Sequence, residues 1–212
     1  TFPPVVPTGW AKAAVDYALA SALLLLALPV LGVALLAVRL TSRGPGMYSQ
    51  KRVGRGGKVF TIYKVRTMYH DCESLTGPRW SIPGDPRVTP LGHVLRTLHV
   101  DELPQLWNVL RGEMSLIGPR PERPEICKEL RRVIPGYDRR HAVKPGITGF
   151  AQVHLPPDSN LRSVRNKVAY DRFYIRRAGP LTDAVIFACT ALKLVGLRKV
   201  YRRPPRREAE DE

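Results

Sequence analysis

The chain has 212 residues, of which 34 are Lys or Arg and 18 are Asp or Glu, so its net charge is +16. This length suffices for one or two small domains with a core. The excess of positive charge predicts an anionic partner, namely nucleic acid, an anionic lipid surface or a phosphorylated substrate. Three distant cysteines without a CxxC pair argue against a zinc site or a disulfide framework and fit a reducing compartment. The first residue is Thr1 and not Met, which leaves open a larger N-terminal region.

An uncharged stretch of 22 residues, Tyr17 to Val38, dominates the N-terminal part of the chain. It is long enough for a transmembrane helix, and a soluble buried helix is rarely so apolar on all sides. Lys12 and Asp16 are the only charged residues before Arg39, and the other 33 basic residues lie from Arg39 onward. The stretch therefore predicts membrane insertion.

Pro29 lies near the middle of this stretch, where it removes a helix hydrogen bond and kinks the helix. A kinked helix can still cross the bilayer, with the basic part of the chain inside, as the positive-inside rule requires. It can also turn back and leave on the side where it entered. Re-entry would place Lys12 and Asp16 on the same face as Arg39 and Arg43. The residues alone leave both arrangements open.

A second apolar stretch, Pro180 to Leu197, lies late in the chain and is interrupted by Asp183 and Lys193. These charges argue against spanning, so the stretch predicts an interfacial amphipathic helix or a core helix. Basic clusters at 176–177 and 198–207 flank it. Such clusters suit anionic lipid headgroups, and a solvated basic tail is the alternative.

Between these segments, alternating β-branched and aromatic residues at Val59 to Val65 predict a strand. The preceding Gly54 to Lys58, "GRGGK", lacks the first glycine and the Ser or Thr of a phosphate loop, so it predicts a tight hairpin turn instead. Lys64 and Arg66 are two residues apart and therefore lie on one face at the end of the strand.

The next segment, Asp71 to Gly92, is rich in Pro and Gly and predicts a long loop. A short helix carrying Arg96 is expected to follow, over Leu91 to Leu98.

Two adjacent carboxylates, Asp101 and Glu102, precede an apolar pattern of helical spacing. The pattern runs at i, i+3, i+4 and i+7 and comprises Leu103, Leu106, Trp107 and Leu110. Pro104 is tolerated only in a first turn, so the helix is predicted to begin near Asp101, with Asp101 as its N-cap. Capping accounts for one carboxylate but not for two together. The rigid Gly-Pro-Arg-Pro that follows fixes the direction of Arg120.

The segments "FTIYKVRTM", "DELPQLWNVLRGEMSLIGPRP" and "VKPGITGFAQV", in this order, resemble the bacterial sugar transferases, the monotopic phosphoglycosyl transferases. The resemblance covers Ala11 to Val200. It implies an α+β fold, a compact helical domain with a small β-sheet, seated on a re-entrant helix–break–helix segment whose break maps to Pro29. The implied domains are a membrane-inserted part over 1–40 and a catalytic domain over 41–212, which ends in the interfacial helix and a basic tail.

The resemblance implies an enzyme that transfers a sugar phosphate from a UDP-sugar to polyprenol (undecaprenyl) phosphate. UMP leaves, and the product begins glycan assembly at the cytoplasmic face of the bacterial inner membrane. The nucleophile maps to Asp101, and Glu102 joins it in holding Mg²⁺. The phosphate-binding cations map to Lys64, Arg96 and Arg120. Simple electrostatics agrees, because a carboxylate and a diphosphate repel one another unless Mg²⁺ and nearby cations neutralise their charge.

Two departures from the family pattern stand out. The family often has Ser-Pro at the membrane break, where this chain has Leu28-Pro29. The family's basic Asn-Gly-Arg after "GITGFAQV" is replaced by "HLPPDSN", which leaves Arg162 or Arg165 as candidate substitutes.

Other functions are weighed against this one. An inactive membrane scaffold and an anionic-lipid-binding protein are the alternatives, and the absence of nucleic-acid-binding motifs argues against a nucleic-acid partner. The sugar, the nucleotide base, and the choice between monomer and homodimer stay open.

Overall fold

The computed structural model describes residues 9–72, 77, 84–158 and 160–197. Its elements follow in this order: α1 (Trp10–Thr41), β1 (Met47–Val53), η1 (Arg55–Gly57), β2 (Val59–Val65), α2 (Pro90–Thr97), η2 (Val100–Glu102), α3 (Gln105–Leu110), β3 (Ser115–Ile117), α4 (Pro124–Val133), η3 (Tyr137–Ala142), β4 (Gly146–Thr148), α5 (Phe150–His154), α6 (Leu161–Arg177) and α7 (Pro180–Leu194). The predicted mixture of helices with few strands is confirmed. The described strands form two sheets of two strands each, where one small sheet was predicted.

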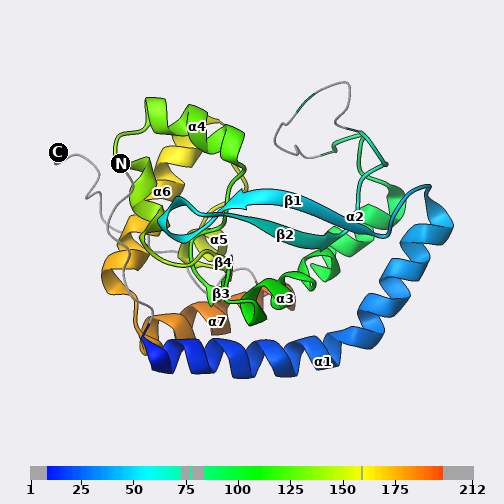
Figure 1. The fold of residues 1–212 in the computed structure, drawn as a ribbon, viewed down its shortest axis with the longest axis horizontal. Helices are drawn as coiled ribbons and strands as arrows, with labels where there is room; N and C mark the ends of the chain where they lie inside the picture. Colours follow the sequence, from blue (N-terminus) through cyan, green and yellow to red (C-terminus); the bar gives the residue numbers. More distant parts are fainter. Residues whose placement is uncertain (1–8, 73–76, 78–83, 159, 198–212) are drawn as a thin grey trace.

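The first sheet is the predicted hairpin. β1 and β2 pair antiparallel from Met47 opposite Val65 to Val53 opposite Val59. Gly56 and Gly57, at φ of 63° and 78°, occupy the left-handed region that glycine adopts without steric cost, and so they allow the tight connection. The second sheet pairs β3 with β4 in parallel. The hairpin spans the molecule above α3, and helices α4 to α6 gather at one end of it (Figure 1).

Helix α1 is one continuous helix of 32 residues, and Pro29 lies inside it. Its ribbon is bent and wraps around one edge of the molecule (Figure 1), as expected where a proline removes a backbone hydrogen bond. The predicted helix–break–helix is thus a bend within a continuous helix. By length and composition, α1 is the one helix among the described residues that could cross a membrane.

One side of α1 packs on the rest of the protein, while its other side is apolar and exposed. The buried side consists of Asp16, Ala20, Ala27, Leu31, Ala34 and Val38. The exposed side includes Val15, Leu19, Leu25, Leu26, Leu28, Val33, Leu36 and Leu40. The small residues on the buried side allow a close approach to α3, and the exposed apolar side has no protein partner in the described chain.

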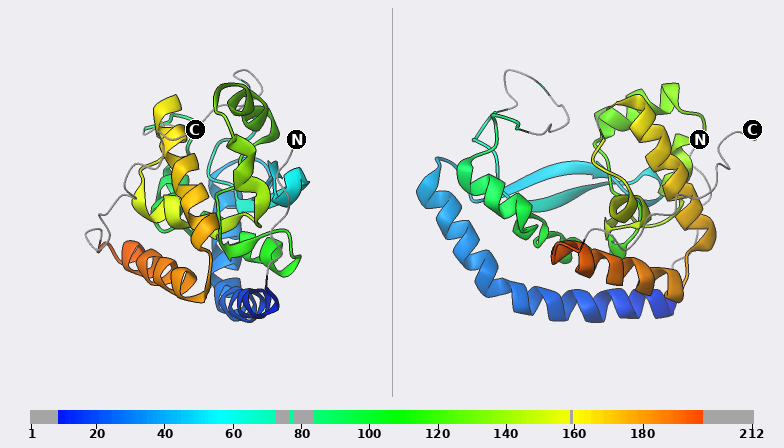
Figure 2. Two further views of the ribbon diagram at one scale, coloured as in Figure 1. Left: turned by 90° about the vertical axis from the view of Figure 1, so that its left-hand side faces the viewer. Right: turned by 180° about the vertical axis from the view of Figure 1, so that it is seen from behind.

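The N-terminal end of α1 is joined to the C-terminal part of the chain. Lys12 donates to Asp183 of α7 over 2.6 Å, and Tyr174 of α6 donates to the other oxygen of Asp183 over 2.8 Å. Asp16, which is buried, accepts a hydrogen bond from the backbone N–H of Leu116 in β3. As a result, α1 and α7 lie along the same edge of the molecule in each view (Figures 1 and 2).

The C-terminal end of α1 is held by Arg66, which follows β2. The Arg66 guanidinium donates to the backbone carbonyls of Ser42 (3.0 Å), Arg43 and Gly44 (3.3 Å). These carbonyls belong to the C-cap residue Ser42 and to the two residues after it, so Arg66 fixes the turn in which the chain leaves α1. Arg66 therefore contacts the segment after α1, whereas Lys64 contacts Glu102.

The helix predicted to begin at Asp101 begins later. Asp101 and Glu102 lie in the short 3₁₀ turn η2, and α3 begins at Gln105 with Pro104 as its N-cap residue. The predicted capping role of Asp101 is therefore wrong, because the chain makes a separate turn before Pro104. In the predicted apolar stripe Leu106 is buried, while Trp107 is 51% exposed.

Two other helices agree closely with prediction. Helix α2 begins one residue earlier than predicted, with Pro90 in its first turn and Thr89 as a cap that accepts from Gly92 N–H. Helix α7 begins at the predicted Pro180 and ends at Leu194, three residues earlier than predicted. The basic cluster at 198–207 and residues 73–76 and 78–83 of the loop predicted over Asp71 to Gly92 lie outside the described residues.

Candidate active site

Glu102 is the centre of the candidate site. Its Oε1 accepts from Lys64 Nζ over 2.9 Å and also from Arg120 Nη2, while its Oε2 accepts from Arg120 Nη1 over 3.3 Å. Arg120 thus grips the carboxylate with both arms of its fork, the strongest geometry available to this pair. Three of the residues predicted to form the site are therefore in direct contact.

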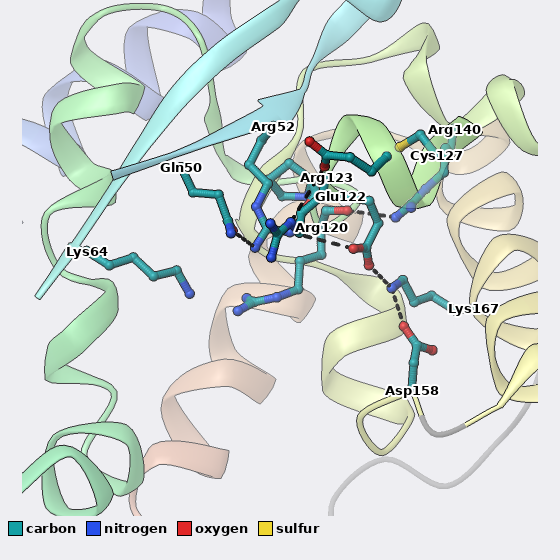
Figure 3. Close-up of polar contacts among 12 residues, drawn as sticks. Gln50, Arg52, Lys64, Arg120, Glu122, Arg123, Cys127, Arg140, Asp158 and Lys167 are labelled. Atoms are coloured by element: carbon teal, nitrogen blue, oxygen red, sulfur yellow. Dashed lines mark hydrogen bonds and ion pairs between the residues drawn. The ribbon is translucent and has the colours of Figure 1, made fainter. Parts of the chain in front are cut away.

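Each of these side chains comes from a different element. Lys64 is carried by β2 near the end of the hairpin, and Arg120 follows β3. In Figure 3, Lys64 and Arg120 extend toward one another from opposite sides. The turn η2 is preceded by His99, whose φ of 55° lies in the left-handed region. This conformation costs a non-glycine residue about 1–2 kcal/mol, and it turns the chain from α2 into the segment that carries Asp101 and Glu102.

Asn108 of α3 fixes the hairpin next to this turn. Its carboxamide donates to Thr61 O over 2.7 Å and accepts from Tyr63 N over 3.2 Å, so it pairs with the edge of β2 that does not face β1. The same nitrogen donates to Glu113 over 2.8 Å. Because α3 directly follows η2, this contact sets the position of Lys64 relative to Glu102.

The charges of the cluster shift its pKa values. Burial by itself raises the pKa of Glu102, but the charges of Arg120 and Lys64 and their hydrogen bonds prevail and hold that pKa well below its usual range. The charge of Glu102 raises the pKa of Arg120 against the effect of burial. Burial lowers the pKa of Lys64, with Glu102 opposing and Arg120 reinforcing the shift. Glu102 is thus ionised and accepts hydrogen bonds from both Lys64 and Arg120.

Asp101 lies buried beside this cluster. Burial raises its pKa, the charge of Lys64 opposes that shift, and the charge of Glu102 adds to it. The charges of Arg96 and Arg120 also favour the ionised carboxylate. Arg96 projects from α2, and its Nε donates to Thr67 Oγ1 over 2.9 Å. All five predicted site residues therefore interact within one electrostatic cluster.

The carboxylate pair suits one kind of metal site. Among the described residues, no group of three or more His, Cys, Asp or Glu side chains lies close enough together to hold a metal ion. A closed site made only of protein ligands is thus not formed there. Mg²⁺ is commonly bound through one or two carboxylates, with substrate phosphates and water completing the shell. Asp101 and Glu102 fit that donor set.

A second ionic cluster, around Glu122, adjoins the first (Figure 3). Glu122 accepts from Lys167 of α6 over 2.6 Å and lies 3.6 Å from Arg52 of β1. Lys167 also pairs with Asp158, in the segment that replaces the family's Asn-Gly-Arg. The positive charges of Lys167, Arg140 and Arg52 lower the pKa of Glu122 to about 2, although burial opposes this shift.

The sequence did not single out this second cluster. Its members lie in four separate segments, and no spacing rule joins them. A weak indication was available in α6 for the neighbouring ion pair of Asp171 with Arg140. Asp171 occupies the same buried stripe as Val164 and Val168. A charge within an apolar stripe predicts a buried ionic partner.

The two arginines considered as substitutes for the missing basic residue have other surroundings. Both Arg162 and Arg165 are exposed on α6. Arg165 donates to the carbonyl of Val133 at the end of α4. Within the described part of the chain, neither arginine contacts Lys64, Glu102 or Arg120.

The profile described as "Bacterial sugar transferase" matches residues 8–196. The chain belongs to the bacterial sugar transferase family. An undecaprenyl-phosphate glucose phosphotransferase of Komagataeibacter xylinus is 49% identical to this chain over 139 residues, which are 64% of this chain and 26% of the relative. The UDP-N-acetylgalactosamine-undecaprenyl-phosphate N-acetylgalactosaminephosphotransferase of Aeromonas hydrophila is 44% identical over 149 residues, 70% of this chain and 35% of the relative.

A UDP-glucose:undecaprenyl-phosphate glucose-1-phosphate transferase of Caulobacter vibrioides is 38% identical over 200 residues, 93% of this chain and 74% of the relative. This chain therefore spans about a quarter to a third of the first two relatives and about three quarters of the third. The relatives' names agree on the undecaprenyl phosphate acceptor and differ in the sugar.

Proposed function

We propose that this chain transfers a sugar phosphate from a UDP-sugar to polyprenol phosphate, releasing UMP and forming a polyprenol diphosphate sugar. The observation that carries the proposal is the carboxylate pair, in which Glu102 is held between Lys64 and Arg120 while Asp101 lies buried beside them. Such cations bind phosphate oxygens as well as carboxylates. The names of the relatives supply the class of donor and acceptor.

In the first step an oxygen of Asp101 attacks the phosphorus that carries the sugar. The bond from that phosphorus to the bridging oxygen breaks, and its electron pair leaves with UMP. Arg120 and Lys64 stabilise the charge that develops on the phosphoryl oxygens. In the second step a phosphate oxygen of the polyprenol attacks the same phosphorus and the Asp101 carboxylate leaves. A covalent relay suits this pair of substrates, because the water-soluble product departs before the lipid reacts.

We also propose Mg²⁺ as the cofactor, held by Asp101 and Glu102. When bound, it would neutralise charge on the diphosphate of the donor. Arg120 keeps a role of its own, since its bidentate contact orients Glu102 in the absence of any ligand.

Re-entry of α1 into one leaflet of the membrane is the arrangement that we propose for the N-terminal helix. Lys12 at one end of α1 contacts α7, and the other end is held by Arg66 next to β2. A straight helix that crossed the bilayer would have its ends on opposite sides, and only one end could reach the catalytic domain. Exposed apolar residues along α1 supply the lipid-facing surface. This arrangement places the site at headgroup depth, on the cytoplasmic face, where anionic lipids would attract the basic chain.

Labelling tests the arrangement. Trp10 is exposed near the start of α1, so a Trp10→Cys variant without the native cysteines can be treated with a membrane-impermeant maleimide. We expect labelling in inverted vesicles, where the cytoplasmic face is accessible, and none in intact spheroplasts. The reverse pattern would mean that α1 crosses the bilayer.

The transfer reaction is tested with purified protein, a short-chain polyprenol phosphate and a panel of UDP-sugars. We expect UMP and a lipid-linked sugar in equal amounts with at least one donor, and a loss of both when EDTA removes divalent cations. If no donor yields UMP while the protein still binds anionic vesicles, the chain is a membrane scaffold and the proposed function is wrong.

A further inference from the structure

The backbone around Arg120 is held by an unusual series of contacts. Four consecutive carbonyl oxygens, from residue 119 to residue 122, each accept a hydrogen bond from a different donor. The donors are Gly146 N to Pro119 O (3.0 Å), Arg140 Nη2 to Arg120 O (2.8 Å), Arg52 Nη1 to Pro121 O (3.1 Å) and Val53 N to Glu122 O (2.9 Å). The segment is therefore fixed from β4, η3 and β1 at once, and prolines on both sides of Arg120 restrict the backbone further.

Arg140 is the contact that acts on Arg120 itself. Its side chain is only 1% exposed, and it donates to Tyr137 Oη over 3.0 Å as well as to the Arg120 carbonyl. Its guanidinium also pairs with Asp171 of α6 over 2.8 Å, and that carboxylate is just as deeply buried. Figure 3 shows Arg140 extending toward this segment from the side away from Lys64. Arg140 therefore reaches the Arg120 backbone from the side opposite Lys64.

Stability alone is a weak reason for such a pair. A buried ion pair often contributes no more to folding than apolar side chains of similar volume, because both charges lose their hydration. Its geometry, however, is specific, since the fork of an arginine fixes two partners at once. Arg140 belongs to such a pair and also donates to the backbone carbonyl of Arg120, and this geometry points to a positioning role.

We propose that Arg140, oriented by Asp171, is a positioning residue that directs the Arg120 guanidinium toward Glu102 and the donor phosphate. The effect on turnover rests on the proposed function, whereas the effect on the backbone does not. A displacement of a catalytic group by about 1 Å can cost about 10²-fold in rate, so release of one carbonyl contact suffices for a measurable loss.

The test uses the double variant Arg140→Met/Asp171→Leu, which replaces both charges with apolar side chains. Each single variant leaves one buried charge unpaired, so we expect a clear fall in the thermal midpoint for the singles and recovery in the double variant. Arg139→Met is the matched control, because Arg139 is the exposed neighbour on the same turn. If the double variant does not recover its midpoint, Arg140→Lys replaces it, since lysine keeps the charge opposite Asp171 but loses the fork.

Hydrogen exchange gives the first readout. We expect faster exchange of the Val53 and Gly146 amides, which donate to the carbonyls of Glu122 and Pro119 on either side of Arg120, in the double variant than in wild type, with no change in the Arg139→Met control. Unchanged exchange in a variant of recovered stability would overturn the proposal. This readout needs no substrate, so it remains decisive even if wild type reacts with no UDP-sugar, an outcome that would overturn the proposed function separately.

UMP release gives the second readout. We expect kcat of the double variant to fall at least tenfold. The same two substitutions should cost nothing more in an Arg120→Met background, because a positioning residue acts only through the group that it positions. Wild-type kcat in the double variant, or an equal further loss in the Arg120→Met background, would show that the pair is merely structural.

Discussion

Glu102 is partly buried and Glu122 is buried. Each carboxylate pairs with two cations, yet the two clusters differ in how much of those cations is exposed to solvent. Glu102 pairs with Arg120, whose side chain is 37% exposed, whereas Glu122 pairs with Lys167, whose side chain is 11% exposed. Beside Glu102 lies a further carboxylate, Asp101. Arg120 can therefore also meet a ligand from solvent, while Arg52 beside Glu122 donates to the backbone carbonyl of Pro121. Similar ionic chemistry thus serves binding in one region and positioning in the other.

The largest effect on folding is expected at the Glu122 cluster. Glu122→Gln leaves Lys167 and Arg52 without their shared carboxylate, and breaking a buried pair in this way costs about 3–5 kcal/mol. The free energy of unfolding, measured by denaturant titration in detergent, checks this value. Glu125→Gln is the control, because the Glu125 side chain is 60% exposed and a surface change of this kind stays within about 0.5 kcal/mol. Equal losses in the two variants would remove the distinction between the clusters.

The pH dependence of stability sharpens the same point. Because the folded pKa of Glu122 is about 2, below the ordinary value of a glutamate, the folded protein binds fewer protons than the unfolded chain. The Glu122 contribution is therefore complete above about pH 4.5 and is lost as the pH falls toward 2. We expect wild type and Glu122→Gln to converge in stability over this window. A constant difference between them down to pH 2 would contradict the assigned charge state.

At the Glu102 cluster the expected effect is on the rate of UMP release. Arg120→Met removes both donors that grip Glu102, and loss of a group that stabilises transition-state charge costs about 10²–10³-fold in kcat. The thermal midpoint should change much less, because the Arg120 side chain is partly exposed. UMP release and circular dichroism measure the two quantities. Arg111→Met, at an exposed arginine after α3, should leave both near wild type. A collapse of the fold in Arg120→Met would mean that Arg120, like Glu122, contributes mainly to stability.

The smallest effect is expected at the end of α1. Lys12 and Asp183 are more exposed than Lys167 and Glu122, so their double-mutant coupling energy should be about 1 kcal/mol or less. Lys12→Met, Asp183→Asn and their combination, compared by thermal unfolding in nanodiscs, give this value. A coupling above 3 kcal/mol would mean that exposure does not separate this pair from the Glu122 cluster.

The sequence predicted the local elements well. Strand β2 follows from alternation between Val59 and Val65, and the glycines before it predict the hairpin, because both patterns depend on neighbours in the chain. The start of α3 was missed, because the apolar spacing begins at Leu103 and gives no sign that Asp101 and Glu102 lie in a separate 3₁₀ turn before Pro104. Neither the parallel pairing of β3 with β4 nor the buried stripe of α6 was predicted, as both depend on distant segments.

The candidate site was predicted from resemblance and not from spacing. Lys64, Glu102 and Arg120 are separated by 38 and 18 residues, and no periodicity joins such positions. The neighbouring ion pairs, Arg140 with Asp171 and Glu122 with Lys167, were not predicted at all. A buried charge predicts an ionic partner, but only the folded chain shows which residue that partner is.

The most direct test of the proposed mechanism is the intact mass of wild type and Asp101→Ala after incubation with Mg²⁺ and a panel of UDP-sugars, without acceptor. We expect wild type to gain the mass of one sugar phosphate and to release one UMP per adduct, while Asp101→Ala does neither. The mass gain would also identify the sugar. UMP release that persists in Asp101→Ala would contradict the assignment of Asp101 as the nucleophile.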